Sequence, residues 1–261
     1  MKRTPIDVLP FEAPSELDEY LKGARLYNSS CSPEATVVFI DKDEGYYLKR
    51  SAKGTLKKEA LMDDFFHKKG LGAEVLGYIS SEHDFLLTAR VKGEDCTNAM
   101  YLSDPKRLCD TLAQALRSLH ETDGSSCPVT DRCADYFLTV VKNHAQGCFD
   151  PSYALGELAS LGADEAFDLA MQGRSLLKSD TLIHGDFCLP NVMLDDWRLS
   201  GYIDLGGGGI GDRSIDLYWG SWTLKFNLKT DAFRERFFDA YGRDKVDPDA
   251  IRIVSLCEAF G

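Results

Sequence analysis

The sequence predicts an α+β protein with a strand-rich lobe followed by a larger, mainly helical lobe. Residues 24–90 hold β-branched and aromatic runs of strand length and one helical segment. Residues 105–123 and 153–177 instead have the composition and spacing of helices. The change falls near residue 90, so we expect an N-terminal lobe over residues 1–90 and a C-terminal lobe over residues 91–261.

The first lobe is expected to be an antiparallel sheet with one helix. Runs at residues 36–40 and 45–50 flank the charged turn DKDE and predict a hairpin. Residues 73–80 and 83–91 predict two further strands. Between these pairs, residues 54–70 have apolar side chains at helical spacing, namely Leu56, Ala60, Leu61 and Phe65.

The second lobe is expected to be helical with three short strands. One helical face in residues 105–123 is formed by Leu108, Leu112, Ala115, Leu116 and Leu119. The strands are expected in TLIHGD, NVMLDD and LSGYIDLG, the last two joined by a hairpin-like DDWR connection. Helices resume from about Ser214.

The composition is that of a globular protein without a membrane-spanning segment. It is 44% hydrophobic and 28% charged, and no apolar run approaches the roughly 20 residues of a spanning helix. The amino terminus lacks the apolar stretch of a signal peptide, so we expect a cytoplasmic protein without membrane partners. Eight irregularly spaced cysteines, without zinc-type pairs, predict free thiols.

The net charge of −12 argues against a nucleic-acid partner, because a phosphate backbone requires basic patches. It would suit a cationic small molecule, although many cytosolic proteins are acidic without such a purpose. We expect a monomer or a weak dimer.

Two short polar motifs interrupt the strands of the second lobe. HGDFCLPN contains Asp186 and Asn191, and YIDLG contains Asp204. Adjacent strands would bring Asn191 and Asp204 to the same end, where hard oxygen ligands suit Mg²⁺ completed by water and phosphate. Asp186 stands apart and suits a base that accepts the proton of a hydroxyl during phosphoryl transfer. Alternatively, both motifs are turns whose Asp side chains bond nearby amides.

The same motifs resemble the small-molecule branch of the protein-kinase fold, in particular the aminoglycoside phosphotransferases and, among them, the 3'-phosphotransferases. That branch has HGDxxxxN and IDxG, which HGDFCLPN and IDLG match. The resemblance covers nearly the whole chain. It includes Lys49 in YYLKR, Glu59 in KKEAL, a hinge in LLTARVKG and the carboxyl-terminal SLCEAFG.

The resemblance implies ATP and Mg²⁺ as cofactors. Asp186 would be the catalytic base, and Asn191 and Asp204 would bind Mg²⁺. Lys49 would bind the α- and β-phosphates, and Glu59 would hold Lys49 by an ion pair. The N-terminal lobe would bind the nucleotide, and the C-terminal lobe would carry the catalytic and substrate-binding groups.

The resemblance also assigns supporting residues. Backbone groups around Ala89 and Val91 would face the adenine, and GTP in place of ATP stays open because this site is mostly backbone. In NSSCSP, phosphate donors would come from Ser30 or its neighbours Ser29 and Ser32. The remaining polar residues are interpreted as structural, with His184 and Asp216 bracing the catalytic loop and His120 packed or capped.

Aminoglycosides are polycations, so the resemblance implies an acceptor site lined by carboxylates. The candidates are Asp186, Glu258, Asp150 and Glu157, with Phe260 packed on a sugar ring. Glu258 can equally be read as a solvated surface charge near the chain end.

Two positions depart from the 3'-phosphotransferase pattern. Gly207 and Trp222 stand where those enzymes have arginines, which leaves open the aminoglycoside and the hydroxyl used. Gly207 belongs to a run of four glycines that is expected to be unusually mobile.

The leading hypothesis is therefore an ATP- and Mg²⁺-dependent aminoglycoside O-phosphotransferase that confers antibiotic resistance. One alternative keeps the fold and changes the acceptor to a choline-like metabolite, a hydroxy amino acid or a macrolide. Another is a catalytically silent nucleotide-binding module.

Overall fold

The computed structural model describes residues 3–31 and 33–261, which form two compact units. The first unit comprises Met1–Ala99 and Pro190–Gly206, and the second comprises Met100–Leu189 and Gly207–Gly261. This division differs from the predicted single boundary at residue 90. Pro190–Gly206 joins the first unit because strand β7 (Glu94–Asp95) pairs with β9 (Val192–Asp195).

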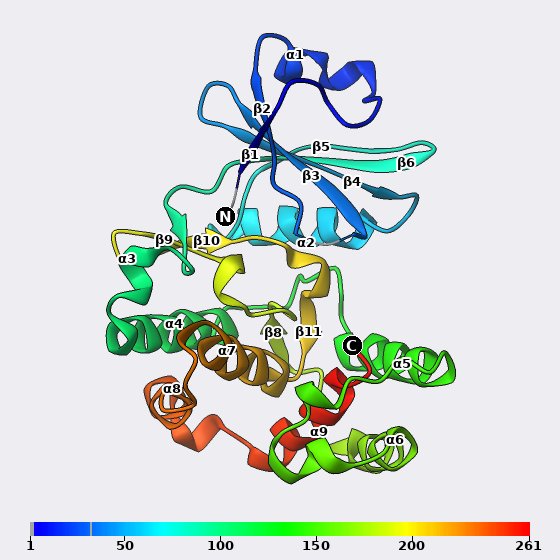
Figure 1. Ribbon diagram of the computed structural model, residues 1–261, viewed down its shortest axis with the longest axis vertical. Coiled ribbons are helices and arrows are strands. Elements are labelled where there is room, and N and C mark those ends of the chain that lie inside the picture. Colours follow the sequence, from blue (N-terminus) through cyan, green and yellow to red (C-terminus); the bar gives the residue numbers. More distant parts are fainter. Residues whose placement is uncertain (1–2, 32) are drawn as a thin grey trace. The chain divides into compact units, whose positions relative to one another are not determined.

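The first unit contains a six-stranded antiparallel sheet in the order β1-β2-β3-β4-β6-β5 (Figure 1). The predicted hairpin is confirmed, because β3 and β4 are paired neighbours with Val37 opposite Lys49. The two later strands are also confirmed as β5 and β6. The strands are β1 (Thr4–Ile6), β2 (Arg25–Asn28), β3 (Ala35–Asp41), β4 (Tyr46–Ala52), β5 (Val75–Ser80) and β6 (His83–Ala89).

Helix α2 (Lys57–Lys68) packs against the sheet through β5 and follows a short α1 (Asp18–Leu21) (Figure 1). Its end before Gly70 fits the predicted segment, because Gly70 has a φ of 72° that favours glycine. Leu61 is expected on the buried apolar face of this helix, but it is 46% exposed. Leu56, Ala60 and Phe65 are buried as predicted, and Met62 and Phe66 are buried beside them.

The hairpin of β9 and β10 (Arg198–Tyr202) completes the first unit and confirms the predicted connection. Asp196 and Trp197, at its turn, both have positive φ values, as a tight two-residue hairpin requires. Tyr202 lies opposite Val192, so the residues that precede β9 and follow β10 meet at one end.

The second unit is mainly helical and holds the two-stranded sheet of β8 (Thr181–Ile183) and β11 (Gly209–Gly211). All five predicted apolar residues of α4 are buried. Its helices, drawn in Figure 1, are α3 (Ala99–Leu102, which starts at the boundary), α4 (Pro105–His120), α5 (Arg132–Ala145), α6 (Ala163–Gln172), α7 (Arg213–Leu228), α8 (Arg234–Tyr241) and α9 (Pro248–Glu258).

Two stretches of this unit differ from the sequence-based expectation. Within the segment 153–177 only α6 is α-helical, and the other residues form 3-10 turns and short irregular stretches. Gly156 has a φ of 56°, which a continuous helix excludes. Helix α5 falls in a region where no element is predicted.

Among the residues that the structure describes, no helix is both long and apolar enough to cross a membrane. The prediction of free thiols is confirmed for all eight cysteines, five of which are buried: Cys96, Cys109, Cys127, Cys133 and Cys257.

Candidate active site

Lys49 is held by two carboxylates in the first unit. Its Nζ lies 2.8 Å from both carboxylate oxygens of Glu59, which α2 presents to β4, and 2.8 Å from Oδ1 of Asp204. The predicted ion pair between Lys49 and Glu59 is therefore confirmed. Asp204, 155 positions later in the chain, meets the same ammonium group.

The two carboxylates keep Lys49 charged. Burial alone would lower the pKa of the Lys49 ammonium, but Glu59 and Asp204 outweigh it, so this pKa lies above its usual value. The sequence analysis missed Asp63, which is buried on the same helix one turn after Glu59. Burial and the nearby Glu59 charge raise the pKa of the Asp63 carboxyl well above its usual value.

Asn191 and Asp204 lie at one end of the β9–β10 hairpin, as predicted from the strand pattern. The backbone N–H of Ile203 donates to the carbonyl of Asn191 at 3.1 Å, which places the two segments side by side. Asp204 has a φ of 60°, an uncommon conformation for a residue other than glycine, and its side chain is 52% exposed.

The side-chain oxygens of these two residues fit a Mg²⁺ ion whose other ligands come from a nucleotide and water. Within residues 3–31 and 33–261 no group of three or more His, Cys, Asp or Glu side chains could hold a metal alone. Mg²⁺ commonly takes one or two carboxylate or amide ligands and completes its octahedron with phosphates and water.

Of the two predicted hinge residues, Ala89 has its backbone N–H hydrogen-bonded and Val91 has its side chain in an apolar cluster. The N–H of Ala89 donates to the carbonyl of Glu74 at 2.9 Å, and the adenine-facing role of Ala89 and Val91 stays a prediction. Val91 is buried in a cluster with Ala73 and Met193, against which Ile203 packs.

Ser30 is already engaged inside the loop that joins β2 and β3. Its hydroxyl accepts from the N–H of Val37 at 2.9 Å, and its own N–H donates to Oδ1 of Asn28 at 2.9 Å. Ser29 is buried, and Ser32 lies outside the described residues. The phosphate role of Ser30 stays a prediction.

In the second unit, Asp216 braces the start of the loop that carries Asp186, the predicted base. This fully buried side chain on α7 accepts from the N–H of His184 and from the N–H of Gly185, both at 2.7 Å. His120 Nε2 lies 3.1 Å from the same carboxylate, and His120 Nδ1 lies 2.8 Å from the hydroxyl of Tyr241. The bracing role predicted for Asp216 and the packed position predicted for His120 are confirmed.

His184 and Asp186 form one tight turn. His184 is buried, and its Nδ1 accepts from the N–H of Asp186 at 3.3 Å, which agrees with a structural role. Cys188 donates its N–H to the carbonyl of Asp186 at 2.8 Å. The backbone is thus fixed on both sides of the Asp186 carboxylate.

Glu258 is buried, so its reading as a solvated surface charge is wrong. Its Oε1 accepts from the hydroxyl of Tyr136 at 2.7 Å and from Nε1 of Trp219 at 3.0 Å. Burial raises the pKa of the Glu258 carboxyl to about 7, although these hydrogen bonds lower it. Within this net value, the Asp186 charge also raises the pKa and the Arg132 charge lowers it.

This pKa predicts how stability depends on pH. The Glu258 carboxyl ionises near 4.5 when unfolded and near 7 when folded, so its contribution is lost as the pH rises through this window. Relative to Glu258→Gln, the wild type should lose about 2 to 3 kcal/mol of unfolding free energy between about pH 5 and about pH 8. Urea unfolding at both pH values checks this. Glu157→Gln is an exposed control that keeps Glu258, so the stability difference between it and the wild type should be the same at both pH values. If the difference between the wild type and Glu258→Gln were also the same at both pH values, the assignment would be contradicted.

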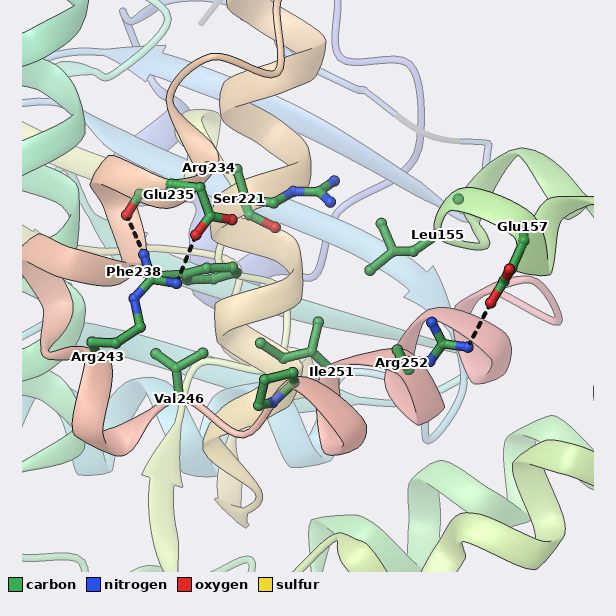
Figure 2. Close-up of a pocket in the computed structure, with 12 residues that line it drawn as sticks. Leu155, Glu157, Ser221, Arg234, Glu235, Phe238, Arg243, Val246, Ile251 and Arg252 are labelled. Carbon is green, nitrogen blue, oxygen red and sulfur yellow. Dashed lines mark hydrogen bonds and ion pairs between the residues drawn. The ribbon is translucent and has the colours of Figure 1, made fainter.

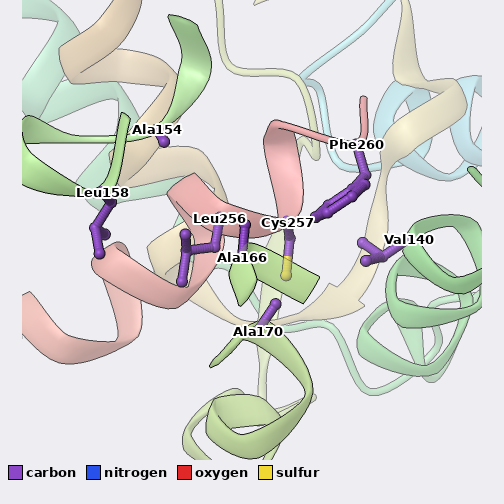
Figure 3. Packing of buried hydrophobic residues seen from close by; sticks show 8 residues of the cluster. All are labelled: Val140, Ala154, Leu158, Ala166, Ala170, Leu256, Cys257 and Phe260. Carbon is purple, nitrogen blue, oxygen red and sulfur yellow. The ribbon is translucent and has the colours of Figure 1, made fainter. Parts of the chain in front are cut away.

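Phe260 does not lie where a sugar ring could pack on it, which corrects the prediction. Figure 3 shows its ring among the buried residues of the α5–α6–α9 core, and it is 1% exposed. Phe149 and Phe167 lie against it with ring centroids 5.1 and 6.1 Å away. The side-chain amide of Asn143 also donates to the carbonyl of Phe260, which attaches the end of the chain to α5.

The other two predicted acidic residues are exposed and separately engaged. Figure 2 shows Glu157 paired with Arg252, at 3.2 Å, on the wall of a cavity of about 430 Å³. Asp150 caps a 3-10 turn by accepting from the N–H of Ser152 at 2.9 Å. Neither contact connects to Asp186, so their substrate roles remain predictions.

The sequence analysis missed Arg132, the first residue of α5. Its Nε donates to the carbonyl of Gly207 at 2.7 Å. Gly207 in turn packs against Gly185 so closely that a Cβ on Gly185 would lie 1.9 Å from the Gly207 oxygen. The glycine run is expected to be mobile, but its packing indicates another use. Gly207 allows close contact between its own segment and the Gly185 segment.

Comparison with known proteins agrees with this geometry. The model of the phosphotransferase enzyme family matches residues 26–254. A probable aminoglycoside 3'-phosphotransferase of Lactococcus lactis subsp. lactis (strain IL1403) is 47% identical over 253 residues, which cover 95% of each chain. The streptomycin 3''-kinase of Streptomyces griseus is 31% identical over 199 residues, 69% of this chain and 70% of the relative.

Solved structures agree on the fold. An aminoglycoside-3'-phosphotransferase of type VIII has a TM-score of 0.78 at 22% identity, covering 95% of this chain and 100% of its own. An aminoglycoside phosphotransferase of Streptomyces rimosus, solved with ADP and streptomycin, has a TM-score of 0.71 at 23% identity, covering 86% and 90%. The predicted kinase-like α+β fold is thereby confirmed. With the family match over most of its length, the chain belongs to the phosphotransferase enzyme family.

Proposed function

We propose that this enzyme transfers the γ-phosphoryl group of ATP to a hydroxyl of an aminoglycoside and so confers antibiotic resistance. The observation that carries the transfer chemistry is the contact of Lys49 with both Glu59 and Asp204. A charged ammonium held by two carboxylates suits the α- and β-phosphates of a nucleotide. The Lactococcus lactis relative, by its name, supports a 3'-hydroxyl as the acceptor.

In the proposed reaction, Asp186 accepts the proton of the acceptor hydroxyl, whose oxygen forms the new bond to the γ-phosphorus while ADP leaves. Asn191 and Asp204 would hold Mg²⁺, which neutralises phosphate charge when bound. The Ala89 carbonyl and the Val91 cluster would face the adenine. A guanine would meet the same backbone groups, so GTP is a second donor to test.

Glu258 supports a cationic acceptor. Its buried carboxyl responds to the charge of Asp186, so the two acids act within one electrostatic environment. An ammonium group of the acceptor beside Glu258 would favour the ionised form of this carboxyl and offset the cost of its burial.

The proposal is tested by coupled ADP release across a panel of aminoglycosides, choline, hydroxy amino acids and macrolides. NMR would locate the phosphorylated hydroxyl. We expect turnover with at least one aminoglycoside having a 3'-hydroxyl and none with the other classes. Turnover with choline, a hydroxy amino acid or a macrolide instead would replace the acceptor, and no turnover with any would favour a silent nucleotide-binding module.

Glu59→Gln should lower kcat/KM for ATP by about 10- to 100-fold, because a charge-assisted contact to Lys49 contributes roughly 1.5–3 kcal/mol. Steady-state kinetics with ATP varied at saturating acceptor measures this. Asp64→Asn on the same helix is the control, since its partner Lys68 is exposed. Equal kcat/KM for Glu59→Gln and the control would contradict the role of the Lys49–Glu59 pair.

A further inference from the structure

The glycine run after Asp204 has a structural use that the phosphotransfer roles do not explain. Ideal Cβ atoms on Gly209 and Gly211 would lie 2.6 and 3.1 Å from the side chain of Arg132. Any larger residue at Gly209 would also meet Val129, and its φ of 147° disfavours a side chain. The glycines therefore leave the space in which the Arg132 stem lies.

Arg132 uses that space to reach the segment beside the catalytic loop. Its side chain is only 14% exposed, and its Nε donates to Gly207 at 2.7 Å. Nη1 makes a longer contact, 3.4 Å, with the half-exposed Asp135 on its own helix. The short hydrogen bond to Gly207 is therefore the better-buried of the two.

Gly207 in turn contacts Gly185, the residue before Asp186. An ideal Cβ on Gly207 would lie 3.0 Å from the carbonyl carbon of Gly185, so the two backbones are in direct contact. Asp216 also restrains Gly185, because the N–H of Gly185 donates to the Asp216 carboxylate. The turn that carries Asp186 is thus held by Asp216 at its N–H groups and by the Arg132–Gly207 contact at its Gly185 backbone.

From this chain of contacts we infer that Arg132 is a positioning residue for Asp186, clamping the Gly207 segment onto the Gly185 backbone. The guanidinium also brings a positive charge close enough to act on Glu258. This role rests on the proposed function, because Asp186 must be the base for its position to affect turnover. A displacement of about 1 Å at a reacting group can cost on the order of 100-fold in rate.

The test compares Arg132→Ala with Arg236→Ala, which removes an equal charge from an exposed ion pair with Asp110. We expect Arg132→Ala to lower kcat by about 10- to 100-fold with little change in KM for ATP. Added guanidinium should partly restore its turnover and leave the control unchanged. If Arg132→Ala does not fold, Arg132→Met serves instead, since it keeps an apolar stem without the donor.

Hydrogen exchange gives a second readout that needs no acceptor. In Arg132→Ala, the amides of residues 185–186 and 207–209 should exchange faster than in Arg236→Ala. Unchanged kcat, or lowered kcat with unchanged exchange at these amides, overturns the inference. If the wild type transfers phosphate to no aminoglycoside, the proposed function fails, and the exchange comparison still decides whether the clamp exists.

Discussion

Replacing Asp186 by alanine is expected to slow phosphoryl transfer by orders of magnitude while nucleotide binding survives. His184 Nδ1 and the N–H of Cys188 contact the backbone of this turn and not the Asp186 carboxylate, so both of these contacts remain in the alanine variant. General-base catalysis contributes about 10²- to 10⁴-fold, and kcat should fall by that factor. Steady-state kinetics measures kcat, and calorimetry measures the Kd for ATP.

The matched control is Asp195→Ala, which removes an exposed carboxylate at the end of β9. Its kcat should equal that of the wild type. Undiminished turnover in Asp186→Ala would remove Asp186 from the role of base. A parallel loss of ATP affinity in Asp186→Ala would instead place this carboxylate in nucleotide binding.

Local patterns predict the nucleotide part of the site well. Alternating strand residues and a two-residue turn are enough to bring Asn191 and Asp204 to one end of a hairpin. Periodicity predicts the strand and the helix that carry Lys49 and Glu59, whereas the pairing of these two residues is implied by the family resemblance. The motif supplies the residue types, and the short connections leave little choice of geometry.

The acceptor part is harder to predict because its contacts join segments far apart in the sequence. Glu258 looks like a surface charge near a chain end, yet Tyr136 and Trp219 from two other helices bury it. Phe260 looks available for a sugar ring, but the packing of α5, α6 and α9 covers it.

The glycine run and Arg132 show the same difficulty. Four consecutive glycines predict mobility when only the neighbours in sequence are known. Their actual use depends on Arg132, about 75 positions earlier, and on Gly185, and no periodicity connects these residues. A glycine-rich stretch beside a catalytic motif is therefore better tested for close backbone contact than assumed to be flexible.

Asp216→Ala is expected to have the largest effect on stability. It removes a fully buried carboxylate that accepts two backbone N–H groups at 2.7 Å and contacts His120. Breaking a buried charged network by removing one partner costs about 3–5 kcal/mol, because the remaining groups lose their partner without gaining water. Urea unfolding measures this loss, and kcat should fall with it since the N–H groups of His184 and Gly185 hold the Asp186 turn.

Asp216→Asn separates the two effects where the alanine variant does not fold. The N–H groups of His184 and Gly185 donate to different oxygens of Asp216, and asparagine has an NH2 donor in place of one of them. One N–H group therefore loses its acceptor, and we expect a smaller loss, about 1–3 kcal/mol. Asp239→Ala, an exposed aspartate on α8 that pairs with Arg243, is the control and should change stability by less than about 1 kcal/mol. An Asp216→Asn variant as stable and as active as this control would show that the catalytic loop keeps its position without the buried carboxylate, and the Arg132 clamp would then be the main restraint to examine.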